Sequence, residues 1–145
     1  MLFAAHGRKE DALPAHIVQG LDLALPAGSI VHHSPNEGRR HVSYKLKMRR
    51  MGMKPGWPDL EVFVPQHGWK DPLQQGPIML EVKRPKGGRV SDAQKRIHER
   101  LRDAGAYCFV VKRIAQVEAV FAALVKLRND AQRDVIRRIC EQTGG

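Results

Sequence analysis

Two short motifs place acidic and basic residues where they could act together. One is Pro58-Asp59, and the other is Glu81-Val82-Lys83. Alternate residues of a strand share a face, so Glu81 and Lys83 should point the same way while Val82 points into the core. Antiparallel pairing of the two segments would bring Asp59 beside Glu81, because their separation of 22 residues leaves room for two strands and a loop.

This arrangement indicates metal-assisted chemistry at phosphorus. Two carboxylates about 4 Å apart repel each other by roughly 4 kcal/mol at an effective dielectric constant of 20, and a bound cation or a shared proton removes that repulsion. Carboxylates together with the backbone carbonyl of Val82 form a hard oxygen set that suits Mg²⁺ or Mn²⁺ rather than Zn²⁺. Lys83 could orient or deprotonate an attacking water, or neutralise charge on a phosphate. The competing interpretation is an exposed turn aspartate and a surface Glu81/Lys83 pair on an edge strand.

The charge balance supports a polyanionic partner. The chain has 145 residues, and 25 Lys and Arg against 15 Asp and Glu give a net charge of +10. Such an excess favours nucleic acid first and an anionic membrane surface second. No apolar run approaches the ~20 residues that span a bilayer, so a membrane-spanning protein is not expected, and nucleic acid rather than a membrane is the expected partner. The N-terminus has no signal-peptide pattern and the two cysteines lie far apart, which predicts a reduced cytoplasmic protein.

The order of the expected elements predicts one α/β domain with a mixed central sheet flanked by helices. We assign residues 1–145 to this domain, with a core at about 10–126. Helices are expected at 13–25, 42–51, 91–104, 116–126 and 129–142, and strands at 29–33, 60–64, 78–83 and 107–111.

Local signals fix several of these boundaries. Pro14 is expected in the first turn of its helix, where a missing N–H costs nothing. Ser91 and Gln94 have the spacing of a capping box, and Gly105 suits the position just after a helix. The nearly continuous apolar run at 107–111 is typical of a central strand covered on both faces.

Four blocks of the sequence resemble a known family. They are Gly56-Trp57-Pro58-Asp59-Leu60, Glu81-Val82-Lys83-Arg84-Pro85-Lys86-Gly87-Gly88-Arg89, Ser91-Asp92-Ala93-Gln94-Lys95 and Gly105-Ala106-Tyr107. They resemble the VRR-NUC domain, the virus-type replication-repair nuclease branch of the PD-(D/E)XK superfamily. The resemblance runs from about residue 10 to 120. It implies a restriction-endonuclease-like core, dependence on a divalent metal, and endonucleolytic cutting of DNA that is often branched or flapped.

The resemblance also assigns roles to individual residues. Asp59 and Glu81 match the metal-binding carboxylates, Val82 the carbonyl ligand and Lys83 the catalytic lysine.

Two further positions match the family with an alternative beside each. Gln94 matches the glutamine on the helix behind the site, and it could equally serve only as the capping partner of Ser91. Glu10 matches an early acidic residue that can add a metal contact, and it could equally be a solvated surface carboxylate. Pro14 departs from the family's long uninterrupted first helix.

Basic residues flank the acidic pair on both sides in the sequence. We expect phosphate contacts, which fix position without reading bases, from the expected basic helix at 42–51 and its neighbours. The nucleic-acid-binding candidates are Arg39, Arg40, Lys54, Arg84, Lys86 and Arg89.

The expected function is therefore a Mg²⁺- or Mn²⁺-dependent DNA endonuclease. From the resemblance we expect a structure-specific enzyme for flaps or four-way junctions in phage or bacterial replication and repair, acting as a homodimer. A catalytically silent DNA-binding module with the same fold is the alternative, and RNA as the substrate would share the same metal chemistry.

Overall fold

The structure is a computed structural model that describes residues 9–34, 42–128, 138 and 141–142. Four strands in it form one sheet with the order β1-β2-β3-β4. Their bounds are Ile30–His33 for β1, Leu60–Phe63 for β2, Ile78–Val82 for β3 and Tyr107–Val111 for β4. The first three strands are antiparallel, and β4 runs parallel to β3. The prediction of a mixed sheet is confirmed.

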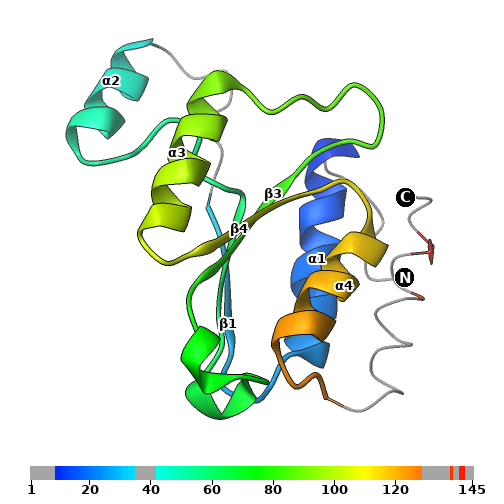
Figure 1. The fold of residues 1–145 in the computed structure, drawn as a ribbon. Helices are drawn as coiled ribbons and strands as arrows, with labels where there is room; N and C mark the ends of the chain where they lie inside the picture. Colours follow the sequence, from blue (N-terminus) through cyan, green and yellow to red (C-terminus); the bar gives the residue numbers. More distant parts are fainter. Residues whose placement is uncertain (1–8, 35–41, 129–137, 139–140, 143–145) are drawn as a thin grey trace.

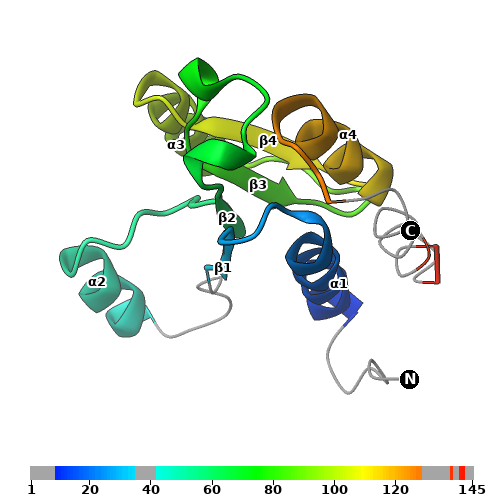
Figure 2. The same cartoon turned by 90° about the horizontal axis from the view of Figure 1, so that it is seen from below.

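Helices cover both faces of this sheet (Figures 1 and 2). Their bounds are Lys9–Ala24 for α1, Val42–Arg50 for α2, Asp92–Asp103 for α3 and Ile114–Leu124 for α4, with 3-10 turns at Gln66–Gly68 and Pro72–Gln74. α1 and α4 lie on one face and α3 on the other, whereas α2 projects beyond the sheet (Figure 2). None of the helices in the described ranges is long and apolar enough to cross a membrane.

The pleat of the two central strands separates the core from the site. Leu60 and Leu80 are cross-strand partners, and both are fully buried in the core cluster that also contains Leu21 of α1 and Phe121 of α4. Because side chains alternate along a strand, the odd-numbered residues of β2 and β3 face α3 instead. The same register places Asp59, the residue before β2, opposite Glu81.

The first helix begins earlier than predicted. We expected it to start at residue 13 with Pro14 in its first turn, but α1 starts at Lys9 and Pro14 lies inside it. Proline there removes one helical hydrogen bond and crowds the preceding turn, at a cost of about 3 kcal/mol. Burial of Ile17 and Leu21, which are 4% and 3% exposed, offsets that cost.

The prediction that 107–111 is a central strand is wrong, because β4 is the edge strand of the described sheet. Its apolar run has a different cause. α3 and α4 both contact β4, so its two faces are covered even though it has one strand neighbour. Tyr107 and Phe109 also stack on each other, with ring centroids 6.2 Å apart. An apolar run indicates that both faces of a strand are covered, and helices can cover both faces of an edge strand.

The helix signals near the site are confirmed. Ser91 caps α3 in a capping box with Gln94, and Gly105 follows the helix with φ of +95°. The basic segment forms α2, none of whose residues is buried. The predicted helix at 129–142 lies mostly outside the described residues.

Candidate active site

Asp59 is placed by the end of β2 and held by the neighbouring strand. Its Oδ2 accepts a hydrogen bond of 2.8 Å from the Val82 backbone N–H. Its own backbone carbonyl accepts one from the Ser34 N–H, also 2.8 Å, just after β1. The carboxylate is therefore fixed beside the end of β3, where the sequence predicted it.

The Pro58-Asp59 pair also changes what the Val82 carbonyl can do. The N–H and C=O of one strand residue point to the same neighbouring strand, so this carbonyl points toward β2, as the Val82 N–H does. Continuing the register of Leu60 with Leu80 places Pro58 opposite Val82. Proline has no N–H to donate, so the ladder bond that would use the carbonyl is missing. The Val82 carbonyl oxygen is therefore left without a ladder partner at the end of β3, beside Asp59.

Glu81 is the most buried charged group of the site. Its side chain is 3% exposed, and its Oε1 accepts a 2.8 Å hydrogen bond from Nε2 of Gln94. Nζ of Lys83 lies 3.4 Å from the same oxygen, so Lys83 and Glu81 share a face of β3 as predicted. Oε2 of Glu81 is buried without a hydrogen-bond partner in the described part of the chain.

The surroundings of Glu81 favour its protonated form. Burial raises the pKa of this carboxyl from its ordinary 4.5 to about 7, and the Asp59 carboxylate adds to the rise while Lys83 opposes it. His98 of α3 lies behind it, with Nε2 3.9 Å from Oε2, which is too far for a hydrogen bond. Burial, with Arg102 and Lys83 nearby, lowers the pKa of His98 and so favours its neutral imidazole.

The raised pKa of Glu81 predicts a pH-dependent contribution to stability in the absence of metal. Between pH 4.5 and 7 the folded protein keeps a proton on Glu81 that the unfolded chain releases, so stability should fall as pH rises through that window. Glu81→Gln cannot ionise, and at pH 8 in EDTA it should be more stable than the parent by about 1–3 kcal/mol. Chemical denaturation at pH 5 and pH 8 measures the difference, which should shrink at pH 5.

Glu99→Gln, on the exposed side of α3, is the matched control for that measurement. It should leave stability unchanged at both pH values. Adding Mg²⁺ at pH 8 should raise the melting temperature of the parent and leave that of Glu81→Gln unchanged. An advantage of Glu81→Gln that is the same at pH 5 and pH 8 would contradict this account.

The residues present fit a hard divalent cation. One cation with oxygen ligands would offset the repulsion between the two carboxylates that helps to raise the Glu81 pKa. It would also give a partner to the Glu81 oxygen that is buried without one in the described part, and to the Val82 carbonyl that Pro58 leaves without a ladder bond. Among the described residues, no three His, Cys, Asp or Glu side chains form a metal-holding group, so the protein ligands here would be two carboxylates and the Val82 carbonyl. Glu10 lies near the start of α1, but its side chain is outside the described part, and its role stays a prediction.

Gln94 caps α3 and also contacts Glu81, while its catalytic role stays a prediction. Its Oε1 accepts the Ser91 N–H at 2.8 Å, which completes the cap of α3, while its Nε2 donates to Glu81. The two bonds fix the orientation of the amide, because its oxygen is used by the cap and its nitrogen by the carboxylate. The capping box therefore aims a hydrogen-bond donor at Glu81.

A cavity of about 460 Å³ opens beside Asp59. The loop between α2 and β2 forms most of its wall, and the end of β1 and the first turn of α3 complete it. The lining residues are Ser34, Gly52, Met53, Lys54, Pro55, Gly56, Trp57, Asp59, Ser91 and Gln94. Asp59, one member of the acidic pair, thus borders a space large enough for a small ligand.

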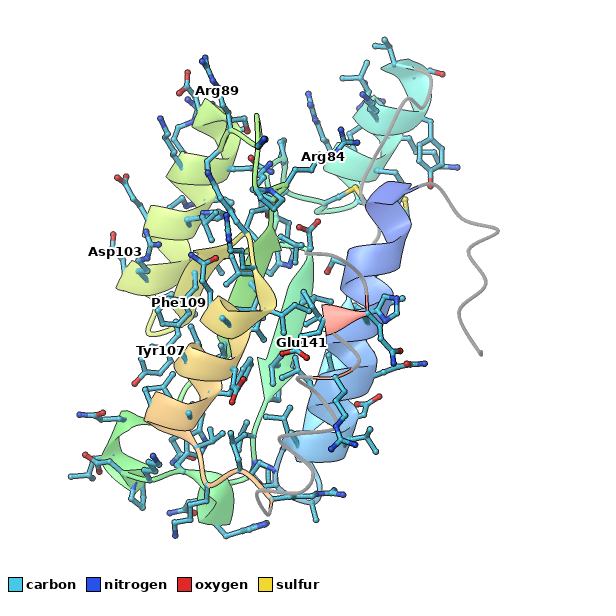
Figure 3. All side chains as sticks on the ribbon, turned by 90° about the vertical axis from the view of Figure 1, so that its right-hand side faces the viewer. Arg84, Arg89, Asp103, Tyr107, Phe109 and Glu141 are labelled. Carbon is cyan, nitrogen blue, oxygen red and sulfur yellow. The ribbon has the colours of Figure 1, made fainter. Side chains whose placement is uncertain are left out.

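The predicted cationic residues are only partly placed by the structure. Lys54 lines the cavity. Arg84, Lys86 and Arg89 are exposed in the segment between β3 and α3, and Arg84 and Arg89 lie at the same end of the molecule as α2 (Figure 3). Arg39 and Arg40 lie outside the described residues.

Three side chains near the site were missed from the sequence. Glu61 follows Asp59 by two positions on β2 and accepts hydrogen bonds from Trp57 Nε1 at 2.5 Å and Ser34 Oγ at 3.1 Å. His98 follows Gln94 by four positions on α3. The two-residue period of a strand and the four-residue spacing of a helix face were the signals that could have found Glu61 and His98. Trp57 was seen only as part of a motif.

Comparisons with known proteins identify the family and the fold. The family model of the VRR-NUC domain matches residues 2–113. One solved structure, a "VRR_NUC domain protein", is 23% identical, covers 82% of this chain and 89% of its own, and superposes with a TM-score of 0.55. Another, a "VRR_NUC domain", is 26% identical with a TM-score of 0.50, covering 80% of this chain and 97% of its own. No curated protein matches the chain.

The family match over residues 2–113 includes the acidic pair, Lys83 and Gln94, and it also includes Trp57, Glu61 and His98. The two structural likenesses extend over about four fifths of the chain. The chain belongs to the VRR-NUC domain family and has its nuclease-type α/β fold.

Proposed function

We propose that this protein is a divalent-metal-dependent DNA endonuclease with Asp59, Glu81 and Lys83 at its active site. The observation that carries the proposal is the placement of both carboxylates and the lysine around one sheet edge, with Lys83 Nζ 3.4 Å from Glu81. An acidic pair beside a lysine is unfavourable as a purely structural device, because one buried Glu81 oxygen finds no hydrogen-bond partner among the residues that the structure describes.

The protein groups would divide the work of phosphodiester hydrolysis. Asp59, Glu81 and the Val82 carbonyl would hold Mg²⁺ or Mn²⁺, which when bound polarises a phosphodiester and lowers the pKa of a coordinated water. Gln94 keeps Glu81 oriented through its donated hydrogen bond. Lys83 would orient the attacking water and neutralise charge that develops on the phosphate.

The charge of the chain supports DNA as the substrate. The net charge is +10, and α2 has four cationic residues and no acidic one among its nine. Lys54 lines the cavity, and this helix with Arg84, Lys86 and Arg89 would offer further phosphate contacts. We propose branched or flapped DNA of phage or bacterial replication and repair as the substrate class, cut by a homodimer whose two sites reach both strands of a symmetric junction.

A cleavage assay on matched oligonucleotides tests this function. Duplex, single-stranded, flap and four-way-junction DNA, and RNA of the same sequence, are incubated with Mg²⁺, Mn²⁺ or EDTA, and the mass of the protein is measured in parallel. We expect cutting of flap or junction DNA in either metal and none in EDTA. Binding without cutting in both metals would instead favour a silent DNA-binding module, and faster cutting of RNA would change the substrate class.

A further inference from the structure

We propose that Trp57 forms a stacking site for one unpaired nucleobase beside the acidic pair. The inference rests on the proposed function and deepens it, because it names the part of the substrate that the cavity takes. A nucleobase in a duplex is already stacked between its neighbours, so such a site selects DNA with an unpaired nucleotide next to the bond that is cut.

The position of Trp57 carries the first step. It is a large aromatic side chain that is 36% exposed, it lines the cavity, and it lies two residues before Asp59. Its indole N–H donates to Glu61 Oε1, which anchors the ring at its polar edge. Glu61 in turn accepts from Ser34 Oγ, another residue of the cavity wall. The ring is therefore held in place rather than folded into the core.

The backbone of the loop fixes this ring relative to the acidic pair. Gly56 has φ of +80°, and a Cβ built on it would lie 2.6 Å from backbone atoms of Ala93 and Gln94. The loop thus packs directly on the first turn of α3, the turn whose Gln94 side chain binds Glu81. Because one close backbone contact joins the Trp57 loop to the support of Glu81, a base on Trp57 would be set at a constant place beside Asp59.

The chemistry of the cavity wall favours a base over a phosphate alone. Met53, Pro55 and Trp57 give it apolar surface, which a phosphate does not need and a flat π-system does. Lys54 stands between Met53 and Pro55 in the same wall and offers a cation to the adjoining phosphate. The volume of about 460 Å³ is within the range of small-ligand pockets, roughly 300–1,000 Å³.

Tryptophan fluorescence gives a direct readout that needs no cleavage. The chain has two tryptophans, and the other one, Trp69, is 2% exposed with its Nε1 bonded to the Val64 carbonyl. Titrating the parent in EDTA with flap DNA should quench the Trp57 emission. Duplex DNA of equal length should quench it far less.

Affinity for the same two DNAs completes the test. Trp57→Ala should weaken binding of the flap DNA about 5- to 100-fold and change duplex binding less than about 2-fold, whereas Trp57→Phe should retain most of the flap affinity. Phe63→Ala, which removes an aromatic ring that is 42% exposed farther along β2, is the matched control and should change neither. An abasic nucleotide in the flap should abolish the difference between the parent and Trp57→Ala.

The outcomes separate this inference from the proposed function. If the protein shows quenching and a Trp57-dependent preference for flap DNA but cuts no DNA, the proposed nuclease activity is wrong and the stacking site is supported. The stacking site alone would be overturned by a different result. In that case the parent cuts normally, but Trp57→Ala lowers the affinities for flap and duplex DNA equally, or lowers neither.

Discussion

Replacing Asp59 with asparagine is expected to lower the rate of metal-dependent DNA cleavage by at least about 10³-fold. Asparagine is nearly the same shape, and its amide oxygen can still accept the Val82 N–H, which is 2.8 Å from Oδ2 of Asp59. What it removes is one of the two negative charges that make the site attractive to a divalent cation. Initial rates on a flap substrate at saturating Mg²⁺ measure the loss.

Asp59→Asn should also show that the lost charge, and not a lost fold, is the cause. The Asp59 carboxylate raises the pKa of Glu81, so its removal should leave the metal-free protein at pH 8 as stable as the parent or more so. Binding of DNA in EDTA should stay within about 3-fold of the parent, because the phosphate contacts come from cationic residues elsewhere. Asp103→Asn, at the far end of α3 from Arg89, is the charge-matched control (Figure 3).

The opposite pattern would remove Asp59 from the active site. If Asp59→Asn and Asp103→Asn cut at the same rate as the parent, the acidic pair does not hold the catalytic metal. Lys83→Met is a second test of the same site, since it removes the ammonium group 3.4 Å from Glu81 and keeps a side chain of similar length. Its cleavage rate should fall about 10²- to 10⁴-fold.

The parts of the site that could be predicted follow from periodicity along single strands. The faces of Glu81 and Lys83 depend only on the two-residue period of a strand. The pairing of Asp59 with Glu81 needs one further fact, the register of the hairpin, which the buried pair Leu60 and Leu80 sets by facing the same core. The capping box of α3 is equally local, and it was confirmed for the same reason.

The missed features depend on contacts between elements distant in the sequence. The burial of His98 beside Glu81 requires α3 to pack against the sheet, and Ser34 reaches Glu61 only because β1 pairs with β2. The start of α1 before Pro14 also depends on tertiary contacts. Burial of Ile17 against the core offsets the cost of a proline inside the helix, and that burial is not visible in the local sequence. Local propensity cannot supply these contacts.

Replacing Gly56 with alanine is expected to lower the cleavage rate at least about 10²-fold, although Gly56 contributes no side chain. Its φ of +80° costs an alanine about 1–2 kcal/mol, and the new Cβ would lie 2.6 Å from the backbone of Ala93 and Gln94. Backbone cannot rotate away as a flexible side chain can, so the loop must move off α3. A displacement of about 1 Å near reacting groups can cost 10²-fold in rate.

Gly52 offers a matched control within the same loop. It has φ of +100°, and a Cβ built on it meets nothing within 4 Å, so Gly52→Ala has the backbone strain without the collision. Both variants should lose roughly similar stability from strain, but Gly56→Ala should lose the larger share of cleavage rate. Thermal melting and initial rates measured on the pair separate the two effects. Equal loss of activity in both would mean that loop strain, and not the contact of the loop with α3, controls the geometry of the site.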